Sequence, residues 1–397
     1  MQRKALAWIA LAALLALTLW FSASAVGPQL AESWALSSGE VAWLTLTVQL
    51  GFVVGAFGIA ATGLADLLPA RRLFIASALV GAGVNGALVF LDGAQVPLAF
   101  GLRFLTGVAL AGVYPSALKV MSGWFAASRG MALGALVGAL TVGSAVPHLI
   151  RGIGLEWQGV ILGASFLTVG AAVIMTFVVE DGPYDTTPPP FSWRLVGAVV
   201  TNRGVRLSTY GYLGHMWELY AMWTWTAAFL AASAVAAGAG TGWVPTATFL
   251  VIAIGGPGSW LAGVLADRYG RTIVAGGAMA VSGSCALLTP LIFGASPWLV
   301  FGLFLVWGFT VVPDSAQFST MVTETADDEL RGTALTLQTG LGFLLTLVTI
   351  RGVPVIAESA GWQWAFPWLA VGPALGVAAM VVLRRSPLRA KLAGGAG

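Results

Sequence analysis

Long apolar runs separated by short polar connections limit the folds open to this chain more than any other feature. A helix needs about 20 apolar residues to cross the hydrocarbon core of a bilayer. Twelve runs reach that length, and they lie near residues 5–26, 41–65, 73–91, 97–122, 131–150, 156–179, 206–232, 243–266, 272–294, 297–320, 332–356 and 362–384. The pattern predicts an all-α membrane protein with twelve transmembrane helices.

The composition agrees with a place in the membrane. Of the 397 residues, 58% are hydrophobic and only 9% are charged, whereas a soluble domain carries about 25% charged residues. Arg3-Lys4 before the first run and Ala23-Ser24-Ala25 at its end resemble a signal peptide with its cleavage site. The run is long enough to span a bilayer, however, so we predict an uncleaved first helix, with cleavage as the alternative.

Twelve spans place both ends of the chain on one side of the membrane. Most of the 19 lysines and arginines lie in connections on that side, and the positive-inside rule makes it the cytoplasm. We therefore expect a multi-pass protein of the plasma membrane, in a bacterium the inner membrane, with cytoplasmic N- and C-termini. The basic residues separate apolar runs rather than forming one face, so we expect the lipid bilayer and no nucleic acid as a partner.

A proline-rich segment from Glu180 to Pro190 divides the chain, because its prolines cannot continue a helix. We predict an N-terminal six-helix bundle at 1–180, a cytoplasmic linker at 181–205 and a C-terminal six-helix bundle at 206–397. The halves also repeat each other: Arg129-Gly-Met-Ala-Leu133 opens the fifth run and Arg331-Gly-Thr-Ala-Leu335 opens the eleventh. Such repeats are typical of secondary transporters, whose substrate site lies at the midplane between them. Both halves lie in one chain, so a monomer is sufficient.

The connection after the eighth run reads Gly263-Val-Leu-Ala-Asp267-Arg268-Tyr-Gly270-Arg271, and it resembles the cytoplasmic loop motif of the major facilitator superfamily. The resemblance covers all twelve runs and implies two pseudo-symmetric halves that work by alternating access. Carboxylates and arginines in such a loop can hold one conformation and release it in another. The residues expected to act in this gating are Asp66, Arg71 and Arg72 in the first half and Asp267, Arg268 and Arg271 in the second.

Two further segments refine the resemblance. Arg103 with Gly107 resembles the fourth-helix motif of the family, in which the arginine is linked to proton coupling; a structural ion pair is the alternative. The segment from Gly123 to Gly134 is similar to the nitrate/nitrite porter branch. That branch reads its anion with arginines on the second and eighth helices, whereas the second run here offers only Gln49 and the eighth has no arginine. The fifth-helix motif of drug/proton antiporters is not matched, because Ser144 replaces its proline.

His215 and Glu218 lie within an uninterrupted apolar run, three residues apart and therefore on one helix face. A charged group near the midplane is costly, so it pairs, becomes neutral or faces water. We predict Glu218 as a proton-coupling residue with His215 as its partner; a permanent ion pair between Glu218 and Arg103 is the alternative. Asp314 follows Pro313 in the tenth run, nearer its cytoplasmic end, and is predicted as a second proton site or part of an inner gate.

The solute site is expected among polar and aromatic residues within the spans. The predicted contacts are Gln49, Arg103, Tyr114, His215, Trp217, Tyr220, Trp223 and Gln338, with plain helix packing as the alternative for each aromatic residue. Arg151 and Arg351 add positive charge at the outer ends of the fifth and eleventh runs, which favours the entry of anions.

Together these features predict a secondary active transporter of a small anionic solute, by proton symport or anion exchange. Proton-driven efflux of amphiphilic compounds is the alternative, favoured by the many aromatic residues near 217–225. The sequence contains no Gly-x-x-x-x-Gly-Lys-[Ser/Thr] loop, no His-Glu-x-x-His and no Gly-x-Ser-x-Gly. We therefore expect neither an enzyme nor an ATP-driven pump, and no metal or other cofactor.

Overall fold

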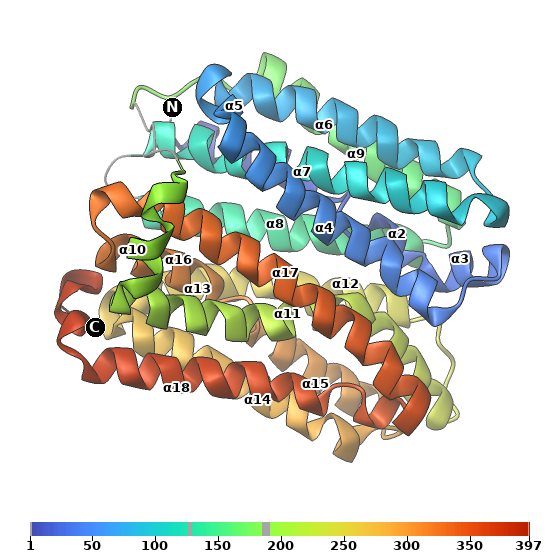
Figure 1. Cartoon of the computed structure of the whole chain (residues 1–397). Helices are drawn as coiled ribbons and strands as arrows, with labels where there is room; N and C mark the ends of the chain where they lie inside the picture. Colours follow the sequence, from blue (N-terminus) through green and yellow to red (C-terminus); the bar gives the residue numbers. More distant parts are fainter. Residues whose placement is uncertain (1, 126–128, 185–190, 396) are drawn as a thin grey trace.

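The computed structural model describes residues 2–125, 129–184, 191–395 and 397, without the side chains of 65, 66, 129–131 and 133 (Figure 1). These residues form helices joined by short connections, and no strand occurs among them. Eleven of the helices are long and apolar enough to cross a membrane. The prediction of an all-α membrane fold is therefore confirmed.

The N-terminal half contains the first nine α-helices. They are α1 (Gln2–Leu17), α2 (Ser22–Ala25), α3 (Gly27–Trp34), α4 (Ser38–Thr62), α5 (Leu64–Leu67), α6 (Ala70–Gly86), α7 (Val96–Trp124), α8 (Arg129–Gly152) and α9 (Trp157–Phe177). Ser37 begins α4 with a reciprocal cap: its hydroxyl accepts from the Glu40 amide, and the Glu40 carboxylate accepts from the Ser37 amide at 2.8 Å.

The short helix α10 (Val196–Thr201) belongs to the connection between the halves. The C-terminal half follows it and contains α11 (Arg203–Ala236), α12 (Val244–Ala253), α13 (Gly255–Tyr269), α14 (Arg271–Ile292), α15 (Pro297–Thr310), α16 (Ser315–Thr325), α17 (Arg331–Ala360) and α18 (Val371–Arg385). Short 3₁₀ segments, among them Pro367–Ala370 before α18 and Pro387–Lys391 after it, join or extend these helices.

The first predicted span, 5–26, is not one helix. The α-helix α1 ends at Leu17, and α2 begins only at Ser22. Thr18 directs its hydroxyl to the Leu15 carbonyl at 2.7 Å. Arg103 of α7 donates to the carbonyls of Leu19 and Trp20, and the Leu19 carbonyl also accepts from the Ser22 amide at 3.4 Å. The break keeps this segment out of the eleven long helical stretches, so the predicted first transmembrane helix, 5–26, consists of α1 and α2 with a break between them.

Two spans of the second half are also interrupted. The helix α12 passes into α13 at Ile254, and α15 ends at Thr310, four residues before Asp314, which caps α16. Pro313 lies in the second break, where it has no amide hydrogen to offer and its ring opposes a continuous helix. Irregular backbone inside a membrane requires partners within the protein, so these breaks mark places where side chains and backbone groups meet in the interior.

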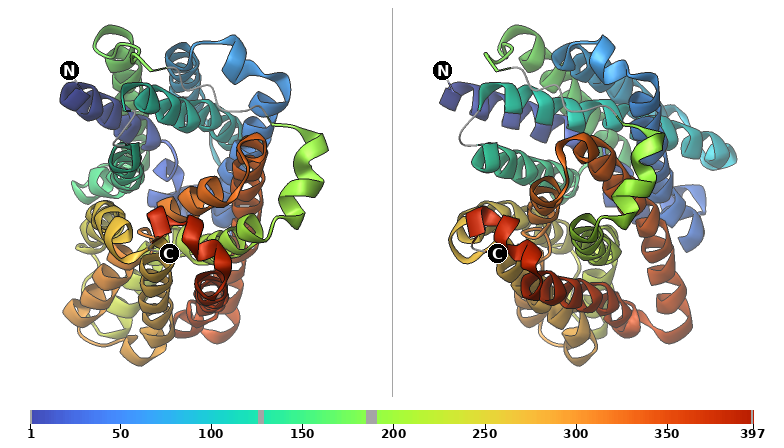
Figure 2. Two further views of the ribbon diagram at one scale, coloured as in Figure 1. Left: turned by 90° about the vertical axis from the view of Figure 1, so that its left-hand side faces the viewer. Right: turned by 60° about the vertical axis from the view of Figure 1, so that its left-hand side comes forward.

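The two halves lie side by side and meet along pairs of helices. In Figure 1 the blue to green helices of the first half lie above the yellow to red helices of the second, and both chain ends lie at the left. The helix α4 packs against α17, and α8 packs against α12 and α13. Figure 2, seen from the end that carries both termini, shows the two bundles with α10 on their outside.

Candidate functional site

Six aromatic rings join the two halves between α1, α4, α11 and α17. We call this group the aromatic cluster; its members are Trp20, Phe21, Phe52, Tyr220, Trp223 and Phe343. The ring centroids of Phe52 and Phe343 lie 4.6 Å apart, and those of Phe21 and Tyr220 lie 6.0 Å apart. These separations are typical of packed aromatic pairs. Each half supplies three of the rings, so the cluster is a contact between the halves.

Helix α4 runs antiparallel to α17, which fixes the depth of the cluster. The hydroxyl of Ser38, at the start of α4, hydrogen-bonds Glu358, near the end of α17. Phe52 meets Phe343 further along the same pair of helices. With a rise of about 1.5 Å per residue, Phe52 lies about 21 Å from the Ser38 end. The aromatic cluster therefore occupies the middle of the membrane-spanning bundle.

Buried polar groups without partners lie on both sides of the aromatic cluster. Gln49 and Gln338 are 0% and 1% exposed, and neither amide has a hydrogen-bond partner. Gln49 precedes Phe52 by one turn, about 4–5 Å toward the Ser38 end, and Gln338 lies about 7–8 Å from Phe343 in the opposite direction. A buried polar group without a partner costs about 1–3 kcal/mol, so these amides are suited to a bound molecule that supplies the missing hydrogen bonds.

The cluster itself also holds unused donors. The indole nitrogens of Trp20 and Trp223 are buried and have no acceptor. Tyr114, on α7, packs against the same hydrophobic core. Trp217 lies apart from the aromatic cluster: its ring packs against Trp368 at 5.2 Å, within the second half, and its predicted contact with the solute stays a prediction.

His215 pairs with Asp314 and not with Glu218, which corrects the predicted partnership. The His215 Nδ1 atom lies 2.8 Å from Asp314 Oδ1, and the side chains are 1% and 2% exposed. The contact has the distance of an ion pair without the direction of a good hydrogen bond, and His215 Nε2 has no partner. Asp314 therefore lies at the depth of His215, deeper than the position predicted near the cytoplasmic end.

Glu218 lies in the interior of the second half, between α11, α14 and α15. Its Oε1 atom accepts from the Trp307 indole at 2.8 Å, and its Oε2 atom accepts from the Ser282 hydroxyl at 2.8 Å. The side chain is 1% exposed. No lysine, arginine or histidine in the described part of the chain lies within ion-pair distance of it. Glu218 is thus a carboxylate solvated by neutral donors alone.

Arg103 holds the break in the first span together. Its side chain is fully buried and donates five hydrogen bonds. The acceptors are the carbonyls of Leu19 (3.2 Å), Trp20 (2.7 Å) and Leu44 (3.2 Å), the Ser22 hydroxyl (3.1 Å) and the Asn85 side-chain oxygen (2.9 Å). It forms no ion pair with Glu218. The predicted roles in proton coupling and solute binding stay predictions, beside this structural one.

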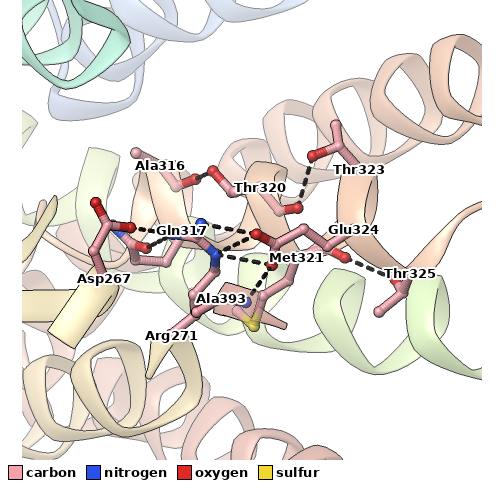
Figure 3. Close-up of polar contacts among 10 residues, drawn as sticks. All are labelled: Asp267, Arg271, Ala316, Gln317, Thr320, Met321, Thr323, Glu324, Thr325 and Ala393. Carbon is pink, nitrogen blue, oxygen red and sulfur yellow. Dashed lines mark hydrogen bonds and ion pairs between the residues drawn. The ribbon is translucent and has the colours of Figure 1, made fainter. Parts of the chain in front are cut away.

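Arg271 belongs to a network of polar contacts in the second half, near the C-terminus of the chain (Figure 3). Its guanidinium donates to both carboxylate oxygens of Glu324, at 2.8 Å each, and to Gln317 at 3.1 Å. Asp267 is 3.6 Å away, and the Ala393 amide donates to Glu324 at 3.2 Å. The predicted pair of Asp267 and Arg271 is therefore part of a larger network centred on Glu324.

Arg268 and the gating residues of the first half are placed differently. Arg268 is exposed and lies over the Tyr269 ring, 5.2 Å from its centroid. Arg71 donates to the carbonyls of Met175, Thr176 and Val179 at 3.2–3.3 Å, and lies 3.7 Å from Asp181. Arg72 is exposed, and the side chain of Asp66 lies outside the described residues. Arg71 and Arg271 thus each bond within their own half.

Sequence reasoning missed several residues that the structure brings into these sites. They are Trp20, Phe52, Ser282, Trp307, Glu324 and Phe343. Most lie in apolar runs, where one more aromatic residue or serine gives no signal. Glu324 gave the only usable signal, because it is a carboxylate at the end of the tenth run. Among the residues described, no three His, Cys, Asp or Glu side chains gather as a metal site would need.

Two curated proteins resemble parts of this chain. It is 27% identical over 173 residues to the gentisate transporter of Corynebacterium glutamicum, which covers 43% of this chain and 37% of that protein. It is 30% identical over 134 residues to the facilitated glucose transporter homolog of Caenorhabditis elegans, which covers 33% of this chain and 26% of that protein. Neither name mentions nitrate or nitrite, so similarity to that branch stays a prediction.

A family model matches a large part of the chain and shows its family. The model described as Major Facilitator Superfamily matches residues 9–248, which is more than half of the chain. The match begins in α1 and continues through the junction of the halves into α12, so it includes the cluster residues of the break after α1 and those of α4 and α11. With its long apolar helices, this chain is a multi-pass membrane protein that belongs to the Major Facilitator Superfamily.

Proposed function

We propose that this protein is a secondary active transporter that moves a small anionic solute by alternating access, coupled to protons or to a second anion. The observation that carries the proposal is the aromatic cluster between the halves, with the partnerless amides of Gln49 and Gln338 on either side of it. Transporters of this architecture bind their solute near the midplane, between two halves that rock against each other. The protein would act as a monomer in a bacterial inner membrane, with its termini in the cytoplasm.

The contact between the halves suits such motion. Phe52 and Phe343 meet through ring faces and edges, which hold each other without directional bonds. The rings can therefore separate without leaving unpaired hydrogen-bonding groups. The polar networks of Arg71 and Arg271 stay within single halves, so each half can move as a unit.

The donors near the aromatic cluster favour a planar organic anion. Among the described side chains no unpaired guanidinium lies there, because Arg103 already donates to five acceptors. An anion would instead be bound by the neutral N–H groups of Trp20, Gln49, Trp223 and Gln338. Neutral donors suit a carboxylate with one delocalised charge, and the rings suit a flat body. The relative named as a gentisate transporter agrees with this class of solute.

Proton coupling is assigned to the two buried carboxylates of the second half. Asp314 has His215 as its ionisable partner, and Glu218 has only the neutral donors Ser282 and Trp307. A carboxylate in an apolar interior exists either paired or protonated, so its proton can follow the opening and closing of the site. His215 adjoins the ring of Tyr212, 6.0 Å away, which connects this pair to the face of α11 near the aromatic cluster.

The test is uptake by the purified protein in proteoliposomes. The probes are gentisate, nitrate, glucose and a hydrophobic cationic dye, each with and without an inward proton gradient. We expect gentisate to accumulate only with the gradient. Glu218→Gln should keep gentisate exchange across the membrane and lose accumulation, because an amide cannot carry the proton. Glu32→Gln, which replaces an exposed carboxylate of α3, is the matched control and should accumulate gentisate as the native protein does.

Other outcomes would contradict specific parts of the proposal. Glucose uptake that ignores the proton gradient would overturn both the anionic solute and the coupling. Pumping of the dye against its gradient would favour efflux of amphiphilic compounds, which the six rings of the aromatic cluster also suit. If Glu218→Gln accumulates gentisate normally, the proton is carried elsewhere.

A further inference from the structure

An apolar groove runs along the outside of α17, at the end of the bundle opposite the termini. It has a volume of about 540 Å³ and is lined by Leu347, Val348, Arg351, Gly352, Val355, Ile356 and Trp368. Arg351 is the only charged residue among them. Val348 and Val355 are 56% and 47% exposed, so this face of α17 points away from the protein and toward lipid.

Arg351 lies at the level of the lipid headgroups. It follows Arg331, the first residue of α17, by 20 positions, which corresponds to about 30 Å of helix and to the thickness of the hydrocarbon core. The side chain is exposed and makes no hydrogen bond or ion pair with any residue in the described part of the chain. The neighbouring carboxylates are already engaged: Glu358 accepts from Ser38, and Glu40 accepts from Ser37.

The symmetry-related arginine is used differently. Arg151 ends α8 as Arg351 approaches the end of α17, but Arg151 donates to the Ala25 carbonyl at 2.8 Å. Its charge therefore serves the interior of the first half. Arg351 has no such acceptor: its guanidinium lies beside Gly39 at the start of α4, where its N–H donors are used by no residue that the structure describes.

The wall of the groove is built by close packing. The ring of Trp368 lies against the α17 backbone at Gly352, where an added Cβ atom would stand 2.6 Å from the ring. The Trp368 indole is fixed by its hydrogen bond to the Ala365 carbonyl at 2.8 Å. The groove is thus a formed apolar surface with one cation above it.

We propose that this groove binds one membrane phospholipid, with the phosphodiester at Arg351 and an acyl chain along Leu347 and Val348. Arginine presents a planar fork of N–H donors that matches the oxygens of a phosphate. The apolar side chains below it match a hydrocarbon chain, and the single positive charge complements the single negative charge of the phosphodiester. This site is separate from the aromatic cluster and does not rest on the function proposed above.

The test is native mass spectrometry of the full-length protein in detergent with palmitoyl-oleoyl phosphatidylglycerol. We expect one lipid to be retained at low lipid concentration, and Arg351→Gln to weaken its binding about tenfold through loss of charge-assisted hydrogen bonds. Val348→Trp, which fills the groove, should weaken it as well. Arg151→Gln is the matched control and should retain the lipid. Thermal unfolding of each variant establishes that it is folded.

Two further probes identify the part of the lipid that is recognised. Diacylglycerol with the same chains lacks the phosphate and should bind much more weakly than phosphatidylglycerol. Inorganic phosphate should not displace the lipid, because it cannot occupy the apolar groove. Three results would each overturn the proposal. They are equal lipid retention by the native protein and Arg351→Gln, a loss in Arg151→Gln as large as that in Arg351→Gln, and binding of diacylglycerol as tight as that of phosphatidylglycerol.

Discussion

The Nδ1 atom of His215 lies 2.8 Å from Oδ1 of Asp314, and both side chains are almost completely buried. His215 belongs to the continuous helix α11, whereas Asp314 lies in the break between α15 and α16. The contact therefore connects a regular helix to a stretch of irregular backbone. A change at either residue affects its partner directly, because the two side chains are buried against each other.

We expect the alanine variants of this pair to be strongly non-additive. Asp314→Ala and His215→Ala each remove one partner of a buried pair, which costs about 3–5 kcal/mol when a charge remains unpaired. The double variant removes both partners and should lose clearly less stability than the sum of the single variants. The measurement is the thermal unfolding midpoint of all four proteins in one detergent. Additive losses would mean that the two groups do not interact as an ion pair.

The network around Arg271 should depend on the shape of the guanidinium as well as on its charge. Arg271→Lys replaces a fork that reaches both oxygens of Glu324 with a single ammonium, so it should lower the thermal unfolding midpoint nearly as much as Glu324→Gln. Hydrogen bonds to charged groups contribute about 1.5–3 kcal/mol each. Arg268→Lys is the control: Arg268 is exposed, and its replacement should leave the midpoint unchanged. If Arg268→Lys lowered the thermal unfolding midpoint as much as Arg271→Lys, the network around Arg271 would not be the cause of the loss.

Gly107 and Gly101, two glycines of α7, should respond in opposite ways to substitution by alanine. A Cβ atom at Gly107 would overlap the Val48 carbonyl of α4 and lie 2.8 Å from the Phe52 amide nitrogen, so α4 and α7 would have to separate. Overpacking of this kind costs about 1–3 kcal/mol. Gly101 has open space around its Cβ position, and alanine there should stabilise the helix by up to about 1 kcal/mol. Thermal unfolding of the two variants distinguishes these effects, and a stable Gly107→Ala would show that the helices can move apart.

The sequence was sufficient to predict features that depend on residues close together in the chain. Apolar runs of membrane length predicted the long helices, and the loop motif that contains Asp267 and Arg271 predicted that its carboxylate and arginines can pair. The main partner of Arg271 could not be chosen in the same way. Glu324 is followed closely by Asp327, Asp328 and Glu329, and only the packing of α14 against α16 selects among them.

The sequence could not predict which side chains pair between helices, for a related reason. His215 and Glu218 have the spacing of a helical pair, yet each side chain contacts a residue outside α11. These tertiary contacts, and not the helical spacing, determine which groups pair. The residues of the break, Thr18-Leu-Trp-Phe21, are ordinary membrane-helix residues with nothing to end a helix. In the structure their carbonyls at Leu19 and Trp20 accept from Arg103, more than 80 positions later, and nothing local in the sequence announces that contact.

Arg103→Lys should therefore loosen the break in the first span. A lysine offers three donors from one nitrogen and cannot reach five acceptors on α2, α4, α6 and the break. The Trp20 carbonyl would lose its donor, at about 1–3 kcal/mol for a buried group left unpaired, whereas the Leu19 carbonyl would keep its bonds from Ser22. We expect a lower thermal unfolding midpoint and faster hydrogen–deuterium exchange confined to residues around 18–22. Arg151→Lys, which affects one bond to Ala25, should leave that segment protected. If Arg103→Lys instead abolishes proton-driven accumulation while exchange and stability stay native, the arginine acts in coupling and not in holding the break.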